Sequence, residues 1–183
     1  MKASKVAIEL IKKYEGCRLS AYRCPAGIWT IGYGHTLGVR SGDVITKDQA
    51  EEYLTQDIEK YETMVNAYND KYKWTQNEFD ALVSFAFNIG NIRGLTQMGS
   101  RSKKQIADAM LLYVKAKGTT LPGLVKRRNE EHEVFTGSDP LYLIALDVIA
   151  GKYGNGAART KALKKLGVDP KSVQKIVNDI LCE

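Results

Sequence analysis

Residues 15–36 read EGCRLSAYRCPAGIWTIGYGHT, and this stretch decides the fold. It begins at the end of an amphipathic helix whose apolar residues recur at helical spacing, namely Val6, Ala7, Leu10, Ile11 and Tyr14. Glu15 occupies the last turn of that helix, and Gly16 supplies the left-handed conformation that ends many helices. We therefore expect the helix to end here and a different kind of structure to follow.

The rest of the stretch predicts a β-hairpin. Residues 18–23 have the mixed polarity of a short strand, and residues 28–33 are rich in β-branched and aromatic side chains. The turn between them, residues 24–27, contains Pro and Gly, which supply the backbone angles of tight turns. Gly32 and Gly34 then mark a bend or a place where something approaches the backbone closely.

Glu15 is the first candidate for chemistry. The C-terminal end of a helix carries partial negative charge, which disfavours an ionised carboxylate and favours the protonated form that a general acid needs. Thr30 and His35 follow on the hairpin, so a carboxylate, a hydroxyl and an imidazole would gather around one site. The pattern predicts a site for acid-assisted hydrolysis. The alternative is a solvated glutamate on a surface helix, because charged residues are mostly exposed.

The spacing of three residues in this stretch resembles the signature of phage-type lysozymes, glycoside hydrolase family 24. The family pattern is Glu, eight residues, Asp or Cys, five residues and Thr, and it falls on Glu15, Cys24 and Thr30. Further motifs match in the family's order, at residues 14–16, 29–36, 45–50, 75–90 and 121–131. The resemblance covers residues 1–137. It implies an α+β fold with a small β-hairpin lobe, a helical lobe and a substrate groove between them.

The resemblance also implies a reaction. It is that of a muramidase, which hydrolyses the β-1,4 bond between N-acetylmuramic acid and N-acetylglucosamine in peptidoglycan. The family is an inverting one, and an inverting glycosidase needs an acid and a base roughly 6.5–9.5 Å apart, with the base activating a water on the opposite face of the sugar. In this interpretation Glu15 protonates the glycosidic oxygen and Thr30 holds the attacking water through its hydroxyl.

Cys24 departs from the commonest form of the pattern, because most relatives have Asp at this position. A free thiol has a pKa near 8.5, so at neutral pH it is mainly protonated and accepts a proton poorly. The alternative to an active muramidase is therefore a peptidoglycan-binding protein with weak or no catalysis.

Four helices are predicted after the hairpin. Three open with capping boxes, formed by Thr46 with Gln49, Thr75 with Glu78, and Ser102 with Gln105. The fourth begins at Pro122 and runs to about Phe135, since Pro is favoured in the first turn of a helix. The helix that begins after Thr75 is mostly apolar, and we expect it to be the central buried one.

Two further residues of the first domain are candidates for substrate contacts. Asn88, near the end of the apolar helix, either reaches the groove or caps its own helix end. His35 either contacts the substrate or is a structural histidine that is hydrogen-bonded to a carboxylate.

The composition changes at residues 136–138, and we divide the chain there into a lysozyme-like domain, residues 1–137, and a small module, residues 138–183. Two Asp-Pro pairs, at 139–140 and 169–170, each combine an N-cap with a proline in the first helical turn. Three short helices are therefore expected, at residues 140–150, 157–166 and 170–181. Residues 146–181 resemble the CW-seven repeat of phage lysins, on the element GKYGNG followed by Arg and on the closing VQKIVNDIL. This resemblance implies a three-helix module that binds peptidoglycan fragments.

Three residues of the module are candidates for wall contacts. Tyr153 offers an aromatic face, Asn155 an amide, and Arg159 a fork of donors for a peptide carboxylate. The alternative is that Tyr153 packs, Asn155 holds the turn and Arg159 is solvated.

The overall composition is that of a soluble globular protein, with 44% hydrophobic and 26% charged residues among 183. No apolar run is long enough to span a membrane, and no signal peptide is apparent, so we expect synthesis in the cytoplasm and action on the cell wall after release. The net charge of +6 favours polyanionic partners. A nucleic-acid binder would gather its basic residues on one face, whereas here they are spread through both halves. We therefore expect peptidoglycan as the partner, no nucleic acid, and a monomer.

The three cysteines, Cys17, Cys24 and Cys182, are predicted to be free thiols. If residues 18–23 are extended, Cys17 and Cys24 lie roughly 20 Å apart, whereas a disulfide needs Cα atoms within about 7 Å. The sequence contains neither a paired Cys or His spacing typical of zinc sites nor a glycine-rich phosphate loop, so no metal and no cofactor are expected.

Overall fold

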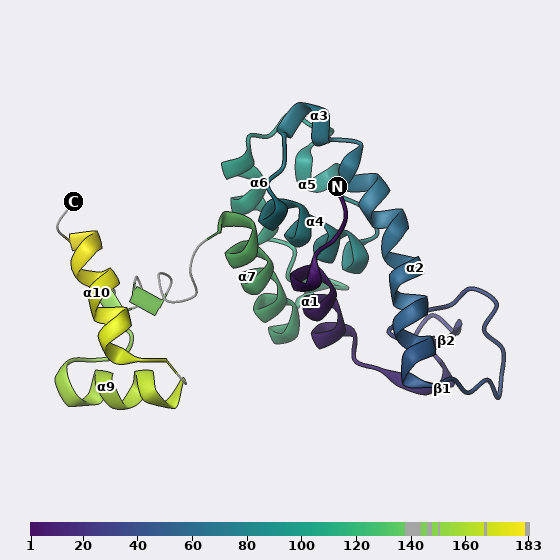
Figure 1. The fold of residues 1–183 in the computed structure, drawn as a ribbon, viewed down its shortest axis with the longest axis horizontal. Coiled ribbons are helices and arrows are strands. Elements are labelled where there is room, and N and C mark those ends of the chain that lie inside the picture. Colours follow the sequence, from purple (N-terminus) through teal and green to yellow (C-terminus); the bar gives the residue numbers. More distant parts are fainter. Residues whose placement is uncertain (138–143, 146–147, 150, 167, 182–183) are drawn as a thin grey trace. The chain divides into compact units, whose positions relative to one another are not determined.

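The computed structural model describes the chain except for residues 138–143, 146–147, 150, 167 and 182–183 (Figure 1). It divides into two compact units, Met1–Phe135 and Thr136–Glu183. The first contains all of the predicted hairpin and the helices around it.

The first helix, α1 (Lys5–Glu15), ends where the sequence predicts. Ser4 caps it by accepting a hydrogen bond from the backbone N–H of Val6, and its apolar stripe buries Ala7, Leu10 and Ile11. Gly16 follows with a positive φ of 66° but an extended ψ of 175°, so it is not in the left-handed helical conformation that we expected. A positive φ favours glycine, and the extended ψ directs the chain straight toward the hairpin.

The hairpin is confirmed as an antiparallel pair of strands, β1 (Arg18–Arg23) and β2 (Trp29–Gly32). Its register places Tyr22 opposite Thr30. The predicted second strand is one residue longer at each end. The turn is closed by two backbone hydrogen bonds, from Cys24 N–H to the Ile28 carbonyl and from Gly27 N–H to the Cys24 carbonyl, at 3.0 and 2.8 Å.

The three predicted capping boxes are all formed, and they open α2 (Lys47–Asn66), α4 (Gln76–Ile89) and α6 (Lys103–Met110). The fourth predicted helix is α7 (Pro122–Thr136). The structure adds short elements that the sequence pattern did not predict: α3 (Asn69–Tyr72), α5 (Arg93–Thr96) and a two-stranded sheet of β3 (Lys115–Ala116) and β4 (Thr119–Thr120). The observed helical lobe is thus the predicted one with small additions between its helices.

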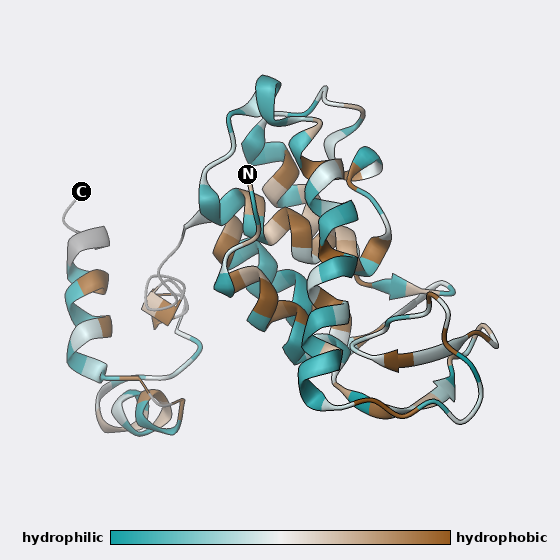
Figure 2. Ribbon diagram, turned by 45° about the vertical axis from the view of Figure 1, so that its right-hand side comes forward, coloured by the Kyte–Doolittle hydropathy of each residue, from teal (hydrophilic) through white to brown (hydrophobic). Residues whose placement is uncertain are grey.

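Helix α4 is the central buried helix, as predicted. Its residues from Glu78 to Ala86 are all buried, and apolar side chains of the surrounding helices pack against it. Figure 2 shows the hydrophobic residues of the larger unit gathered where its helices face one another. This packing gives the site below a fixed frame, because the functional side chains of α1, α4 and α7 project from helices that share one core.

Helix α2 connects the two lobes of the larger unit, running from the β1–β2 ribbon to the region of α3 (Figure 1). Two contacts fasten the ribbon end to it. Lys47 Nζ donates a hydrogen bond to the Tyr33 hydroxyl at 2.5 Å, and His35 Nδ1 lies 2.9 Å from a carboxylate oxygen of Asp57. The predicted lysozyme-like arrangement of a β-hairpin lobe and a helical lobe is confirmed.

The second unit contains α9 (Gly156–Lys165) and α10 (Pro170–Leu181) around a small core of Ala145, Val148, Leu163, Val173 and Val177. Asp169 caps α10 by accepting a hydrogen bond from the Ser172 N–H at 2.9 Å, the role predicted from the Asp-Pro pair. Most of the predicted helix at residues 140–150 lies outside the described residues. Of that segment, residues 144–145 and 148–149 are described and are helical.

None of the helices in the described part of the chain combines the length and apolarity needed to cross a membrane. Cys17 and Cys24 are free cysteines, and Cys182 lies outside the described residues.

Candidate active site

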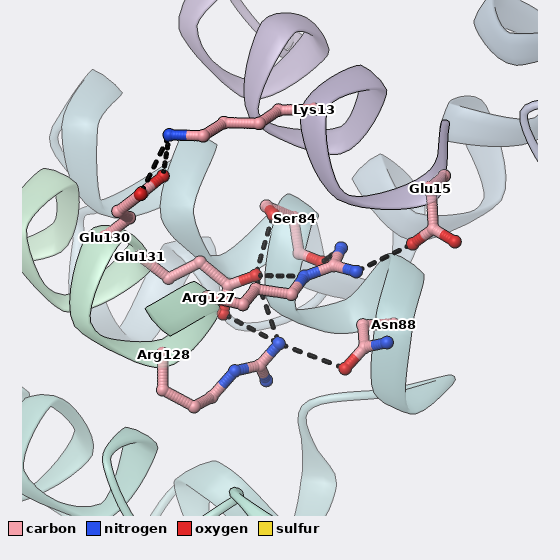
Figure 3. A network of polar contacts seen from close by, with 8 residues as sticks. All are labelled: Lys13, Glu15, Ser84, Asn88, Arg127, Arg128, Glu130 and Glu131. Carbon is pink, nitrogen blue, oxygen red and sulfur yellow. Dashed lines mark hydrogen bonds and ion pairs between the residues drawn. The ribbon is translucent and has the colours of Figure 1, made fainter. Parts of the chain in front are cut away.

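Glu15 is held at the end of α1 by an ion pair with Arg127 of α7. Arg127 Nη1 donates to Glu15 Oε1 at 2.7 Å. The guanidinium is buried, with 3% of its side chain exposed, whereas 25% of the Glu15 side chain is exposed. The second carboxylate oxygen of Glu15 has no hydrogen-bond partner among the described residues and projects away from Arg127 (Figure 3). One oxygen of the carboxylate is thus anchored, and the other is available.

Arg127 is itself part of a buried network between α4 and α7 (Figure 3). Its Nε donates to Glu131 Oε1 at 3.0 Å, and its Nη2 donates to the backbone carbonyl of Ser84 at 3.1 Å. The Ser84 hydroxyl also donates to Glu131, at 2.8 Å. Because all three donor arms of the guanidinium are engaged, its position relative to Glu15 is closely defined.

Glu131 is fully buried and has a second cationic partner, Arg128. Burial raises the pKa of Glu131, and the guanidinium groups of Arg128 and Arg127 and the hydroxyl of Ser84 counteract that rise. Burial likewise lowers the pKa of Arg128. Two guanidinium groups and two carboxylates, with Glu15 at the exposed end, therefore form one charge cluster.

Asn88 lies at the edge of this cluster. Its side-chain carbonyl accepts a hydrogen bond from Arg128 Nη2 at 3.0 Å (Figure 3). The C-cap of α4 is Gly90, whose backbone N–H bonds to the Ala86 carbonyl, and Asn88 is bound to Arg128 instead of to its own helix end. Arg128 thus fixes the orientation of the Asn88 amide.

Cys24 and Thr30 lie together at the tip of the ribbon. The Thr30 side chain is buried, and its hydroxyl lies within hydrogen-bonding reach of the Ile28 carbonyl, at 3.1 Å, and of the Cys24 sulfur. The backbone N–H groups of Ile28 and Ala26 lower the pKa of the Cys24 thiol, and the Thr30 hydroxyl adds to this effect. The hairpin turn therefore favours the thiolate form of Cys24.

His35 is buried, and both of its ring nitrogens face acceptor atoms of the protein. Nδ1 lies 2.9 Å from Asp57 Oδ2, Nε2 lies 3.0 Å from the Leu37 carbonyl, and the ring stacks on Tyr53 with centroids 4.4 Å apart. These contacts are those of the structural alternative, a histidine bonded to a carboxylate, and they leave neither nitrogen free for a sugar.

The three candidates in the second unit are placed differently from one another. Tyr153 packs, partly buried, against the core of the unit. Asn155 is the N-cap residue of α9 but makes no side-chain capping hydrogen bond. Arg159 lines a pocket of about 470 Å³ together with Lys164, Lys171 and other residues of α9 and α10. The structure therefore brings only Arg159 of the three to this pocket.

The sequence did not single out Arg127, Arg128, Glu131 or Ser84 as functional. All four lie within the motifs at residues 75–90 and 121–131. However, the charged run KRRNEE at residues 126–131 has the composition typical of a solvated helix face. Among the described residues, no group of three or more His, Cys, Asp or Glu side chains is arranged to hold a metal ion.

Comparison with known proteins identifies the two parts of the chain. Residues 12–131 match the Phage lysozyme family model, and residues 143–181 match the CW_7 repeat. The chain belongs to the phage lysozyme family.

Individual relatives agree with this assignment. An endolysin of Acyrthosiphon pisum secondary endosymbiont phage 1 is 42% identical over 145 residues, which cover 74% of this chain and 98% of that protein. The structure of the endolysin from Escherichia coli O157:H7 phage FAHEc1 is 39% identical with a TM-score of 0.66, covering 76% of this chain and 96% of that one. The muramidase domain of SpmX from Asticaccaulis excentricus is 36% identical with a TM-score of 0.62, covering 73% and 97%.

The two family-model matches confirm both resemblances that the sequence motifs indicated, one for each part of the chain. Membership of the phage lysozyme family supports peptidoglycan hydrolysis as the activity of this chain.

Proposed function

We propose that this phage lysozyme family member is a muramidase that cleaves the β-1,4 bond between N-acetylmuramic acid and N-acetylglucosamine, with Glu15 as the general acid. The observation that carries the proposal is the pairing of a partly exposed carboxylate with a buried guanidinium, Arg127. Such a pair fixes the carboxylate while leaving one of its oxygens open to a ligand.

This geometry supports the following role for Glu15. Glu15 binds its proton on the oxygen that does not face Arg127 and donates it to the glycosidic oxygen as the bond breaks. The carboxylate that results is stabilised at once, because the Arg127 guanidinium already donates a charge-assisted hydrogen bond to its other oxygen.

Thr30 and Cys24 supply the second half of an inverting reaction. The Thr30 hydroxyl has one hydrogen, for which the Ile28 carbonyl and the Cys24 sulfur are the neighbouring acceptors. With that hydrogen on either one, the oxygen retains lone pairs that accept a hydrogen bond from the attacking water. Cys24 then removes a proton from that water. Its lowered pKa supports this role, because it increases the thiolate fraction near neutral pH. This favours an active enzyme over the alternative of a binding protein with weak or no catalysis.

The second unit supplies binding to the cell wall. Arg159, Lys164 and Lys171 line one pocket between α9 and α10, together with the carboxylate of Asp169, which is bound to Ser172. The three positive charges outnumber this one negative charge, so the pocket fits the carboxylates of peptidoglycan peptides. Tyr153 and Asn155 precede α9, and the Asn155 side chain makes no capping hydrogen bond to that helix. We propose that Arg159 provides the main contact and that Asn155 and Tyr153 contribute from the adjacent turn.

The test of catalysis is the rate of lysis of purified peptidoglycan by Glu15→Gln, with mass spectrometry of the products to identify the bond that is cleaved. Glu9→Gln is the matched control, because it makes the same change on an exposed residue of α1 whose ion pair in the described part of the chain is with Lys12. We expect Glu15→Gln to lose lysis and Glu9→Gln to retain it, with products ending in N-acetylmuramic acid. Full activity of Glu15→Gln, or products of another cleavage, would reject the assignment.

A further inference from the structure

The charge cluster behind Glu15 contains one residue whose role the proposed reaction does not explain. Glu131 is fully buried, yet it accepts hydrogen bonds from Arg127, Arg128 and Ser84 at 2.8–3.2 Å. The same guanidinium, that of Arg127, therefore donates to Glu131 through Nε and to Glu15 through Nη1 (Figure 3). Two carboxylates share one arginine, and only one of them is near solvent.

This sharing bears on the general acid. An arginine that paired with Glu15 alone would favour its ionised form, whereas a general acid must carry a proton when the substrate binds. A second negative charge on the same guanidinium offsets that effect, because it repels the charge that Glu15 would acquire on ionisation.

Glu131 carries that negative charge in the active state. If Glu131 and Glu15 were both protonated, the two buried guanidinium groups of Arg127 and Arg128 would have no counter-charge in the cluster. Uncompensated buried charges are strongly disfavoured. Protonation of the exposed Glu15 with Glu131 ionised leaves the buried charges paired.

We propose that Glu131 is a positioning residue for catalysis, which acts through Arg127 to let Glu15 hold its proton at neutral pH. This inference rests on the proposed role of Glu15 as the general acid.

The groups that face Glu131 and Glu15 come from all three helices packed around the cluster. They are Tyr14 from α1, Ser84 and Asn88 from α4, and Arg127 and Arg128 from α7. Tyr14 is uncharged at neutral pH, because burial and the neighbouring Glu130 raise the pKa of its hydroxyl. Glu130 forms an ion pair with Lys13 at 2.7 Å, toward the surface. Among these described groups, Glu131 is therefore the negative charge that balances Arg127.

The experiment is the pH profile of peptidoglycan lysis by the full chain and by Glu131→Gln, with Glu130→Gln as the control. The control makes the same change one residue earlier, in a partly exposed pair. The alkaline limb of the profile reports loss of the proton from the general acid. Two like charges at opposite donors of one guanidinium couple by on the order of one pH unit. We therefore expect the alkaline limb of Glu131→Gln to move to lower pH by about one unit, and that of Glu130→Gln to stay in place.

A second variant tests the opposite direction of the shift in the alkaline limb. Arg128→Met removes a positive charge from the cluster but leaves Arg127 bound to both carboxylates, so we expect its alkaline limb to move to higher pH. General damage to the fold would lower the rate without shifting the two limbs in opposite directions. Because Glu131→Gln leaves Arg128 buried without its partner, circular dichroism must first show that it folds. If it does not fold, the direction of the Arg128→Met shift decides.

Several outcomes would overturn the inference. They are an unchanged alkaline limb in folded Glu131→Gln, an Arg128→Met limb that is unchanged or moves to lower pH, and failure of both variants to fold, which would assign the cluster to stability alone. Failure of the proposed function is distinguishable from these, because Glu15→Gln would then retain lysis or the unmodified protein would give the products of another cleavage.

Discussion

Replacement of Arg127 by Met tests whether the buried cluster stabilises the larger unit as well as holding Glu15. Methionine keeps much of the apolar stem but removes the three donor arms that bind Glu15, Glu131 and Ser84. Removing one partner from a buried ion pair costs about 3–5 kcal/mol, because the other charge is left uncompensated. Glu131 retains Arg128 at 3.0 Å, so we expect the lower end of that range, about 3 kcal/mol.

The assay is urea unfolding followed by tryptophan fluorescence. Both tryptophans of the chain, Trp29 and Trp74, lie in the larger unit, so the signal reports that unit and not the small one. With a slope of about 2 kcal/mol per molar urea, the midpoint should fall by about 1.5 M.

Lys13→Met is the matched control for this experiment. It breaks a pair with Glu130 whose lysine is half exposed, and exposed pairs contribute only about 0.2–1 kcal/mol. The Arg127→Met midpoint should therefore fall several times further than that of the control. Equal midpoints for the two variants would refute the reasoning that burial makes the cluster contribute more to the free energy of unfolding than an exposed ion pair does.

Three further outcomes are expected. Thr30→Val should fold normally by circular dichroism but lower the turnover number about 10- to 100-fold, because it removes the hydroxyl that holds the attacking water; an unchanged turnover number would exclude that role. Cys24→Asp should retain or raise lysis and move the acid limb of the pH profile to lower pH, because a carboxyl loses its proton well below even a lowered thiol pKa; an acid limb that stays in place would show that Cys24 is not the base. Thr75→Ala should cost about 1 kcal/mol of stability in the same urea assay, because it removes the capping box of α4, and a midpoint equal to that of the unmodified protein would contradict this.

Much of the fold was predictable because it depends on neighbours in the sequence. The capping boxes at Thr46, Thr75 and Ser102 use side chains that bond to backbone only three residues away, and all three are formed. The hairpin follows from its turn residues and from β-branched side chains on its second strand. The four-residue helices α3 and α5 have no side-chain cap that the sequence could have indicated, and each contributes buried residues to the larger unit. The β3–β4 pair is exposed and is only two residues long on each side of its turn, too short for a strand pattern to stand out.

The candidate site was predictable only in part. Glu15, Cys24 and Thr30 lie within one motif of 16 residues, so their spacing could be read directly. The sequence left two roles open for His35. Of the contacts that favour the structural role, the one with the Leu37 carbonyl is local, but the one with the Asp57 carboxylate involves a helix 22 residues away. The orientation of Asn88 depends on Arg128, 40 residues further along the chain.

The sequence by itself determined where α1 ends, where α2, α4, α6 and α7 begin and where the hairpin lies, and which residues could supply an acid, a hydroxyl and a thiol. Only the tertiary structure decided the surroundings of the acid. Arg127 lies 112 residues from Glu15, and the run KRRNEE has the composition of a solvated surface, yet Arg128 and Glu131 are fully buried. Desolvation and charge pairing depend on distances in space, which a pattern of neighbouring residues does not contain.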